Sequence, residues 1–391
     1  MSDEQVQSVP GDGRIAIIGG GVVGLSLAHH LARLGYTDVV VIERGQLGEG
    51  ATAYATGGIR QQFTSEINAR LVHRSVELFS RFTEDTGAPF RFRQHGYMFL
   101  LSREQDLQAF TRAVRMQNGH GIESRVIDPS EVASIMPVTR TDDLLGATYC
   151  PTDGSATPQE AVAGYASSAS RHGVRIERGC TVTGILRDAH GAVSGVQTSN
   201  GRVEASVVVI AAGPQSRDVA RLADVDLPVA PHRRQAFQAR AGDWVTADLP
   251  LTVDLTSGAY LHPEGGGALV IGGNDRDVPE GTDLTVDTTL VESLVEALVH
   301  RFPAMEDVQV GRGWAGLREM TPDDHAIVGP VDETGSLWAM AGFSGHGFMQ
   351  APAIGEAVAQ LLTTGRSTID LSVLGAGRFA EGRLIGESVV F

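Results

Sequence analysis

Residues 14–24 read RIAIIGGGVVG, and this stretch sets the architecture of the chain. The apolar run at its start is typical of a strand buried in a parallel sheet, and the residues after the glycines predict a helix. Gly19 permits a tight turn, Gly21 lets the backbone approach a pyrophosphate, and Gly24 lets the helix pack closely on the strand. The stretch therefore predicts a βα unit that binds a dinucleotide.

A carboxylate stands at the distance that such a unit requires. Residues 38–42 form a second apolar strand that leads into Glu43, which lies 19 residues after Gly24. A carboxylate at that place can accept hydrogen bonds from ribose hydroxyls, while the N-terminus of the preceding helix faces the phosphates. An ordinary tight turn between strand and helix is the alternative interpretation.

The composition limits the classes of function. The chain has 391 residues and a formal net charge of −16, with 42% hydrophobic and 20% charged residues. This length suits two domains, and the composition excludes disorder as the main state. The acidic balance argues against nucleic acid or an anionic membrane as a partner. No apolar stretch approaches the roughly 20 residues of a membrane helix, so no membrane insertion is expected.

The cysteines and the absent lysines narrow the chemistry. Cys150 and Cys180 have neither the number nor the spacing for a zinc site or a disulfide framework, so no metal is expected. Free thiols suit a reducing cytoplasm, and the polar residues 1–13 lack the pattern of a signal peptide. We therefore expect a cytoplasmic protein. All 31 basic residues are arginine, which excludes a lysine base or a Schiff base.

Glycine motifs of the nucleotide-binding type occur near both ends of the chain, which predicts two interleaved domains. Short strands with hairpin turns at His190–Gly191 and Asn200–Gly201 are expected over 174–210, and further strands over 235–273. Helices are expected over 64–82, 103–117, 158–172, 288–302 and 352–362.

Four motifs along the chain resemble the D-amino acid oxidase superfamily of FAD-dependent oxidoreductases. They are residues 17–24 with Glu43 and Arg44, the Ala-Ala-Gly-Pro of 211–214, the segment 314–323 and the glycine-rich segment 341–349. Within that superfamily, the GGIRQQF of residues 57–63 is most similar to the sarcosine oxidase beta-subunit branch. Monomeric sarcosine oxidase and glycine oxidase are more distant relatives. The resemblance covers nearly the whole chain.

The resemblance implies an α/β fold with FAD as the cofactor. It places a doubly wound, Rossmann-like FAD-binding domain at residues 1–86, 150–225 and 314–391. It places an interleaved substrate domain, with an antiparallel sheet over the flavin, at residues 87–149 and 226–313.

The resemblance also assigns the contacts with FAD. The turn at Ala212 and Gly213 is expected beside the diphosphate, Val182 beside the adenine, and the loop 343–349 against the isoalloxazine ring. A glycine turn that only caps the last helix is the alternative for that loop. The full set of expected contacts is Gly19, Gly21, Val22, Val23, Gly24, Glu43, Arg44, Thr52, Gly58, Ile59, Val182, Ala212, Gly213, Gly316, Leu317, Phe343, Gly345, His346, Gly347, Phe348 and Met349.

Arg318 is the leading candidate for a substrate-binding residue. In glycine oxidase-like relatives the arginine of the matching Gly-Leu-Arg motif pairs with the substrate carboxylate, for which a guanidinium fork is well suited. A structural salt bridge to Asp323 or Asp324 is the alternative.

Three further residues complete the expected catalytic set. Arg60 matches an arginine near the flavin, or it is a solvated loop side chain. Tyr260 matches a tyrosine that faces the substrate, or it belongs to the core. His346 is a polar or cationic group beside the flavin, or a capping residue, and His262 is a weaker candidate.

The chain departs from its relatives at positions that matter for the cofactor. Gly316 stands where some relatives attach FAD through a cysteine, and Tyr54 where others use a histidine, so we expect noncovalent FAD. Val270 stands where monomeric sarcosine oxidase has a lysine that activates oxygen, and Met349 takes the place of a second cationic substrate contact. We therefore expect slow reaction with oxygen, unless His346 or an arginine such as Arg60 supplies the positive charge. A quinone or another protein is the alternative electron acceptor.

The sequence thus predicts an FAD-dependent amine or amino acid oxidase or dehydrogenase. Its small-molecule substrate would be an amino acid or N-alkyl amino acid, oxidised at the C–N bond by hydride transfer to flavin N5. Two alternatives stay open. One is a 2-hydroxy acid dehydrogenase on the same fold, and the other is a flavin-binding subunit that needs a partner subunit in a larger complex.

Overall fold

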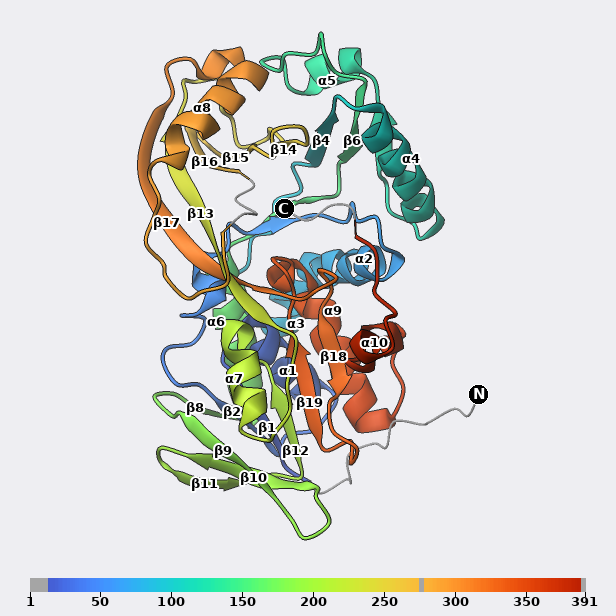
Figure 1. The fold of residues 1–391 in the computed structure, drawn as a ribbon, viewed down its shortest axis with the longest axis vertical. Helices are drawn as coiled ribbons and strands as arrows, with labels where there is room; N and C mark the ends of the chain where they lie inside the picture. The colour runs from blue at the N-terminus through green and yellow to red at the C-terminus, as the bar shows by residue number, and fades with distance from the viewer. Residues whose placement is uncertain (1–12, 274–277, 388–391) are drawn as a thin grey trace.

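The computed structural model describes residues 13–273 and 278–387, which form two large sheets, one above the other in Figure 1. The lower sheet has six strands, which run parallel except for the edge strand β18. In order across the sheet they are β18 (Ile327–Pro330), β19 (Leu337–Ala341), β12 (Val207–Ile210), β1 (Ile15–Ile18), β2 (Val39–Ile42) and β8 (Arg175–Glu177).

The apolar run that precedes the glycines forms β1 in the middle of this sheet. It pairs in parallel with β12 and β2, and Ile15 lies opposite Val207 on one side and Val39 on the other. Every residue of these three strands is buried. Because both faces of the sheet are covered, the three sequences are continuous apolar runs and not alternating ones.

Helices cover one face of the six-stranded sheet. They are α1 (Val22–Arg33), α2 (Glu66–Ser80), α6 (Pro158–Arg171) and α9 (Gly347–Thr364). α1 and α9 approach closely at Gly355, where an added Cβ would lie 2.3 Å from Ser26 Oγ. α9 begins at Gly347, five residues before the predicted start at Pro352, because the proline is accommodated in its second turn.

The opposite face of the six-stranded sheet is also covered. A small antiparallel sheet packs there with α7 (Ser216–Arg221). Its strands are β9 (Val182–Arg187), β10 (Val193–Thr198) and β11 (Gly201–Glu204). The predicted hairpin turns connect them, with φ values of +83° at Gly191 and +118° at Gly201. The parallel core itself is Rossmann-like, as predicted.

The upper sheet has eight strands, and neighbours are antiparallel except for the pair β14 and β4. In order they are β17 (Gln309–Met320), β13 (Ala230–Arg240), β16 (Ala268–Gly272), β15 (Tyr260–Gly265), β14 (Leu251–Asp254), β4 (Tyr97–Leu101), β6 (Gly146–Cys150) and β5 (Arg125–Ile127). β17 is continuous, so the expected domain boundary between residues 313 and 314 falls inside a strand of this sheet.

Helices α4 (Glu104–Gly119), α5 (Pro129–Ile135) and α8 (Leu290–Arg301) accompany the upper sheet. The remaining short elements are β3 (Gly58–Ile59), β7 (Gly154–Ser155), α3 (Phe82–Thr86), α10 (Gly377–Ala380), and the 3-10 turns η1 (Ala51–Tyr54), η2 (Gly213–Gln215), η3 (Pro303–Met305) and η4 (Ser372–Leu374). Within residues 13–273 and 278–387, none of the helices has the length and apolarity that crossing a bilayer requires.

Candidate active site

A cavity of about 1070 Å³ runs from the carboxyl ends of β1 and β2 to the larger sheet. The carboxyl ends of parallel strands are the usual place for a ligand in such a sheet. All the expected cofactor residues line this cavity except Gly24 and Ile59. The four expected catalytic residues line it as well, and they are Arg60, Tyr260, Arg318 and His346.

The glycines of the first turn are required for two different steric reasons. Gly19 has a φ of +118°, and an added Cβ would lie 2.2 Å from the carbonyl oxygen of Ala211. An added Cβ at Gly24 would lie 2.2 Å from the carbonyl oxygen of Gly19. Gly24 therefore acts by letting α1 pack on the turn, and it does not need to touch a ligand.

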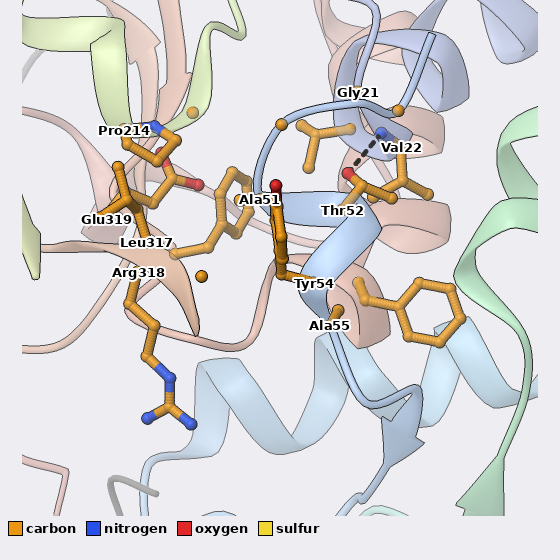
Figure 2. A pocket seen from close by; sticks show the side chains of 18 of the residues that line it. Gly21, Val22, Ala51, Thr52, Tyr54, Ala55, Pro214, Leu317, Arg318 and Glu319 are labelled. Carbon is orange, nitrogen blue, oxygen red and sulfur yellow. Dashed lines mark hydrogen bonds between the residues drawn. The ribbon is translucent and has the colours of Figure 1, made fainter. Parts of the chain in front are cut away.

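The N-terminus of α1 opens onto the cavity. Its cap residue is Gly21, which offers no side chain, and its first turn contains no acidic residue. The backbone N–H of Val22 donates to Thr52 Oγ1 over 3.3 Å, as Figure 2 shows. The positive end of the helix dipole is thus available to phosphate groups.

Glu43 lies directly after β2, at the end of the second strand, as the sequence predicted. Its Oε2 accepts from the N–H of Gly20 at 2.7 Å, and its Oε1 accepts from the N–H of Gly45 at 2.8 Å. These bonds fix the carboxylate at the cavity wall. Each oxygen keeps a further lone pair with which it can accept from a ribose hydroxyl.

The loop before α9 brings a second helix N-terminus to the cavity. Gly347, Phe348 and Met349 form the first turn of α9, line the cavity and include no acidic residue. Gly345 has a φ of +93°, and an added Cβ would lie 2.8 Å from Arg318 Nε. The side chain of Arg318 therefore packs directly over this loop, which can only be glycine at that point.

Arg60 is buried, so the interpretation as a solvated loop side chain is wrong. The residue is 2% exposed. Its Nη1 donates to the carbonyl oxygen of Gln62 at 2.8 Å, and its guanidinium carbon lies 4.1 Å from the centre of the Phe63 ring. Burial lowers the pKa of Arg60, but a guanidinium stays charged at any physiological pH. Arg60 therefore supplies a fixed positive charge beside the cavity.

His346 is neutral, and its partner decides which nitrogen carries the proton. Arg60 Nη2 lies 3.2 Å from His346 Nε2. Because a guanidinium can only donate, Nε2 accepts and the remaining proton is on Nδ1. Burial, with Arg60 and Arg318 nearby, holds the pKa of His346 well below 6.5. The structure thus supports a neutral polar group for His346 and a cation for Arg60. His346 is also the N-cap residue of α9, although its side chain makes no capping hydrogen bond to the helix.

Arg318 points into the cavity and is not held by the first of its expected structural partners. Asp323 instead pairs with Arg378, with Nε and Nη2 of the arginine 2.8 and 2.9 Å from its two carboxylate oxygens. Both of these side chains are buried. The alternative interpretation, a structural salt bridge from Arg318 to Asp323, is therefore wrong.

The larger sheet supplies apolar and phenolic side chains to the same end of the cavity. Tyr260 lines the cavity and is only partly buried, and it also packs against a buried apolar cluster that includes Phe99 and Leu101. Tyr97 and Leu251 lie beside it in the lining. Burial raises the pKa of Tyr97 to about 12, so its phenol stays protonated. Nothing in the sequence marks Tyr97 as a site residue, because β4 is a plain apolar run.

Besides Gly24, three expected positions lie away from the main cavity. Ile59 is fully buried in the core beneath the helices. His262 lines a separate, smaller cavity of about 360 Å³, and burial lowers its pKa to about 3. Val270 pairs with His262 across β15 and β16 and does not line the main cavity. The argument from Val270 to slow reaction with oxygen therefore has no support in the structure.

Gly316 and Tyr54, which stand at the positions compared above with FAD-attaching residues, meet at the cavity wall. An added Cβ at Gly316 would lie 2.5 Å from Tyr54 Cβ, so the tyrosine occupies the space that a larger residue would need. Neither residue offers a thiol or an imidazole. Cys180 also lines the cavity, but beside Val182, where the resemblance places the adenine.

We expect acid precipitation of the FAD-loaded protein to release all of its flavin. The reason is that Gly316 and Tyr54 cannot form a thioether or a histidyl link. Absorbance of the supernatant and the washed pellet at the flavin band measures the released and retained fractions. Yellow colour that stays with the denatured protein would contradict the expectation.

Glu319 is a buried carboxyl group that the sequence did not single out. It leaves β17 on the side opposite Arg318 (Figure 2), lines the cavity and is 8% exposed. Its Oε2 accepts from the N–H of Gly342 at 3.0 Å. Burial raises the pKa of Glu319 to about 7, against the opposing effect of the N–H groups of Gly342 and Phe343. The group therefore holds a proton in the folded protein at a pH where an unfolded chain has lost it.

This raised pKa of Glu319 makes the folded protein less stable as the pH rises. Between the ordinary pKa of 4.5 and about 7, the folded protein binds more protons at Glu319 than the unfolded chain does. Stability therefore falls as the pH rises through this window and levels off above it. We expect the free energy of unfolding of Glu319→Gln to fall by about 1–3 kcal/mol less than that of the wild type over this pH range. Chemical denaturation of both proteins with saturating FAD at pH 5 and pH 8 measures this difference. The same pH dependence in both proteins would contradict the expectation.

The sequence of this chain is similar to characterised proteins along most of its length. Residues 14–361 match the family described as FAD dependent oxidoreductase. The mitochondrial sarcosine dehydrogenase of Homo sapiens is 29% identical over 386 residues, which are 95% of this chain and 42% of that protein. This chain therefore spans less than half the length of that relative. The sarcosine oxidase subunit beta of Rhodobacter capsulatus is 29% identical over 387 residues, 96% of this chain and 90% of that protein.

Solved structures share the fold. The L-proline dehydrogenase from P. horikoshii superposes with a TM-score of 0.89 and 32% identity, covering 96% of this chain and 100% of that one. The glycine oxidase from Geobacillus kaustophilus superposes with a TM-score of 0.81 and 26% identity, covering 94% of this chain and 98% of that one. Both similarities include the two large sheets.

Proposed function

Because this chain belongs to the family of FAD-dependent oxidoreductases, we propose that it oxidises the C–N bond of an amino acid or an N-alkyl amino acid. The family confirms the resemblance predicted from the four motifs, and it makes the protein an enzyme with FAD as its cofactor. The similar proteins are named for sarcosine, proline and glycine, each of which carries an amine beside a carboxylate.

The residues that line the cavity suit FAD, independently of the similarity to other proteins. Two helix N-termini without acidic residues open onto it, at Gly21 and at Gly347. The turn at Gly19 leaves no room for a side chain, and Glu43 stands where a ribose would be bound. When bound, FAD supplies the acceptor for a hydride.

The residues of this chain bind and orient the substrate. Arg318 would hold the carboxylate with paired N–H donors, which fixes the direction of the amine. Arg60 adds a second positive charge near the same end of the cavity. Holding the substrate in one orientation lowers the entropic part of the barrier, and Tyr97 and Leu251 help to exclude water.

A strong protein base takes no part in this scheme. The lone pair of His346 Nε2 already accepts from Arg60, so this histidine is not free to take a proton. The chain contains no lysine. In this proposal the rate gain therefore comes mainly from positioning and desolvation of the substrate.

One observation carries the proposal more than any other. The guanidinium of Arg318 lies over Gly345 in the loop that leads into α9, on the wall of the same cavity as the dinucleotide-binding turn. A carboxylate bound there would lie beside the part of the cavity that the resemblance assigns to the isoalloxazine ring.

Anaerobic mixing tests the proposal. The FAD-loaded protein is mixed with sarcosine, dimethylglycine, proline, glycine and D-amino acids, and the flavin absorption band is followed. At least one of these should bleach the flavin. No bleaching by any of them would contradict the proposal. Bleaching by 2-hydroxy acids alone would favour the hydroxy acid dehydrogenase.

The second candidate is a flavin-binding subunit of a larger enzyme. The similarity to a sarcosine oxidase subunit beta, over 90% of its length, favours it, because a subunit implies a partner. In that case the protein should bind FAD and accept electrons slowly until the partner is added. A cytoplasmic location belongs to this proposal as well, and fractionation of the source cells tests it.

A further inference from the structure

We propose that Glu387 is a positioning residue that holds the Arg60 loop, defined here as residues 60–65, in its substrate-binding geometry. The inference rests on the proposed function for its kinetic consequence, but the contact itself does not depend on the substrate. It adds a residue from the end of the described chain to a site whose two arginines are Arg60 and Arg318. No motif in the sequence indicates it.

The carboxylate of Glu387 accepts hydrogen bonds from two successive residues of the loop. Its Oε1 accepts from the N–H of Thr64 at 2.9 Å and from the hydroxyl of Thr64. Its Oε2 accepts from the N–H of Ser65 at 3.3 Å and from the hydroxyl of Ser65 at 2.8 Å. The Nδ2 of Asn68 donates to Oε2 at 3.4 Å. Both oxygens are thus fully engaged by one short segment.

The contact lies immediately before α2. Ser65 is the N-cap residue of α2, and its side chain makes no capping bond to the helix. Glu387 accepts from the N–H groups of Thr64 and Ser65, which precede the first helical residue, Glu66, so its negative charge lies near the positive end of the helix dipole. Because the carboxylate comes from a segment more than 300 residues away, it fixes the position of the start of α2 relative to that segment.

The Arg60 loop connects the contact with Glu387 to the cavity. Phe63, next to Thr64, packs its ring against the guanidinium of Arg60 at 4.1 Å and against the ring of His346 at 4.9 Å. Arg60 in turn donates to the carbonyl oxygen of Gln62. A shift of the backbone at Thr64 therefore moves the surface on which the Arg60 guanidinium rests.

The segment that carries Glu387 is anchored at a second point near the active site. The N–H of Ile385 donates to Asp323 Oδ2 at 3.2 Å, and Asp323 is the carboxylate that pairs with Arg378. Asp323 lies five residues after Arg318, in the turn that follows β17. In Figure 1 the chain leaves α10 and rises to reach α2. The segment thus joins the turn after the Arg318 strand to the Arg60 loop.

The charge of Glu387 suits this role. Burial acts to raise its pKa, but the hydrogen bonds from Thr64 and Ser65 and the charge of Arg60 outweigh it, so the pKa lies below the usual range. Glu387 is therefore ionised at neutral pH, and its carboxylate opposes the effect of burial on Arg60. The carboxylate both holds the loop and partly compensates the buried cation.

Three variants test the inference. Glu387→Ala removes the acceptors, and Glu387→Gln keeps one acceptor oxygen without the charge. Glu381→Ala is the matched control, because Glu381 is exposed in the same segment and contacts Arg383. Hydrogen exchange of the FAD-loaded proteins, read on a peptide that covers residues 60–68, needs no substrate. Steady-state kinetics then separate KM from kcat.

We expect Glu387→Ala to speed exchange at Thr64 and Ser65 by about tenfold or more, since their N–H groups lose their acceptors. KM should rise by about tenfold with kcat changed less, because ground-state binding by Arg60 is what loosens. Glu387→Gln should fall between the wild type and Glu387→Ala, and Glu381→Ala should match the wild type in both measurements.

Unchanged exchange in Glu387→Ala would overturn the inference. So would faster exchange with an unchanged KM, since the segment would then be structural only. A wild-type protein that no amine reduces would refute the proposed function instead, and that result is separate from the exchange measurement.

Discussion

Replacing Arg318 by alanine is expected to lower kcat/KM by about 30- to 1000-fold. The change removes a charge-assisted pair worth very roughly 2–4 kcal/mol in a desolvated site, at ~1.4 kcal/mol per factor of ten. FAD should be retained, because the residues expected at the phosphates and the ribose lie at the other end of the cavity. Stopped-flow reduction and steady-state kinetics measure the loss.

Two further variants make this result specific. Arg318→Lys keeps the charge and loses the planar fork, so it should recover only part of the activity. Arg312→Ala removes an exposed arginine of the same strand that does not line the cavity, and it should behave as wild type. Near-wild-type kinetics for Arg318→Ala would show that the arginine is structural.

Gly24→Ala is expected to weaken FAD binding by about 10- to 100-fold, which corresponds to the ~1–3 kcal/mol cost of overpacking. The added methyl group would lie 2.2 Å from the carbonyl oxygen of Gly19, so α1 must move away from the turn that it helps to form. Reconstitution of apoprotein with FAD, followed by flavin fluorescence, gives the dissociation constant.

The control for this variant is Gly119→Ala at the end of α4. An added Cβ there meets no atom within 4 Å, so FAD binding should not change. Wild-type affinity in Gly24→Ala would mean that the turn tolerates the shift, and the steric account of this glycine would fail.

The sequence predicted the parallel core well because its signals are local. The run before Gly19, the acid at Glu43 and the spacing between them depend on residues that lie close together along the chain. The start of α9 was predicted less well. Pro352 predicts a helix start at that position, whereas the helix already begins at Gly347 and includes the proline.

The parts of the site that the sequence missed depend on contacts between distant segments. The burial of Arg60 follows from packing against Phe63 and His346, and residue 346 lies 286 positions away. The raised pKa of Glu319 follows from its burial in the fold, against which the N–H group of Gly342 acts. Neither the exposure of a loop arginine nor the protonation of a strand glutamate can be read from neighbouring residues.

The electron acceptor illustrates the same limit. The absence of lysine is certain from the sequence, but the position assigned to its replacement, Val270, lies outside the cavity lining. Arg60 provides a buried cation beside the cavity instead. The choice between oxygen and another acceptor stays a prediction, and Arg60 is the residue at which to test it.

The central claim is that the enzyme recognises a substrate carboxylate while it oxidises the adjacent amine. The most direct measurement compares two compounds in anaerobic stopped-flow reduction of the FAD-loaded protein: the best amino acid or N-alkyl amino acid substrate, and the same amine without its carboxylate. The account predicts fast bleaching of the flavin by the first and bleaching slower by about two orders of magnitude or more by the second, in line with the loss expected for Arg318→Ala. Equal rates with both compounds would contradict it.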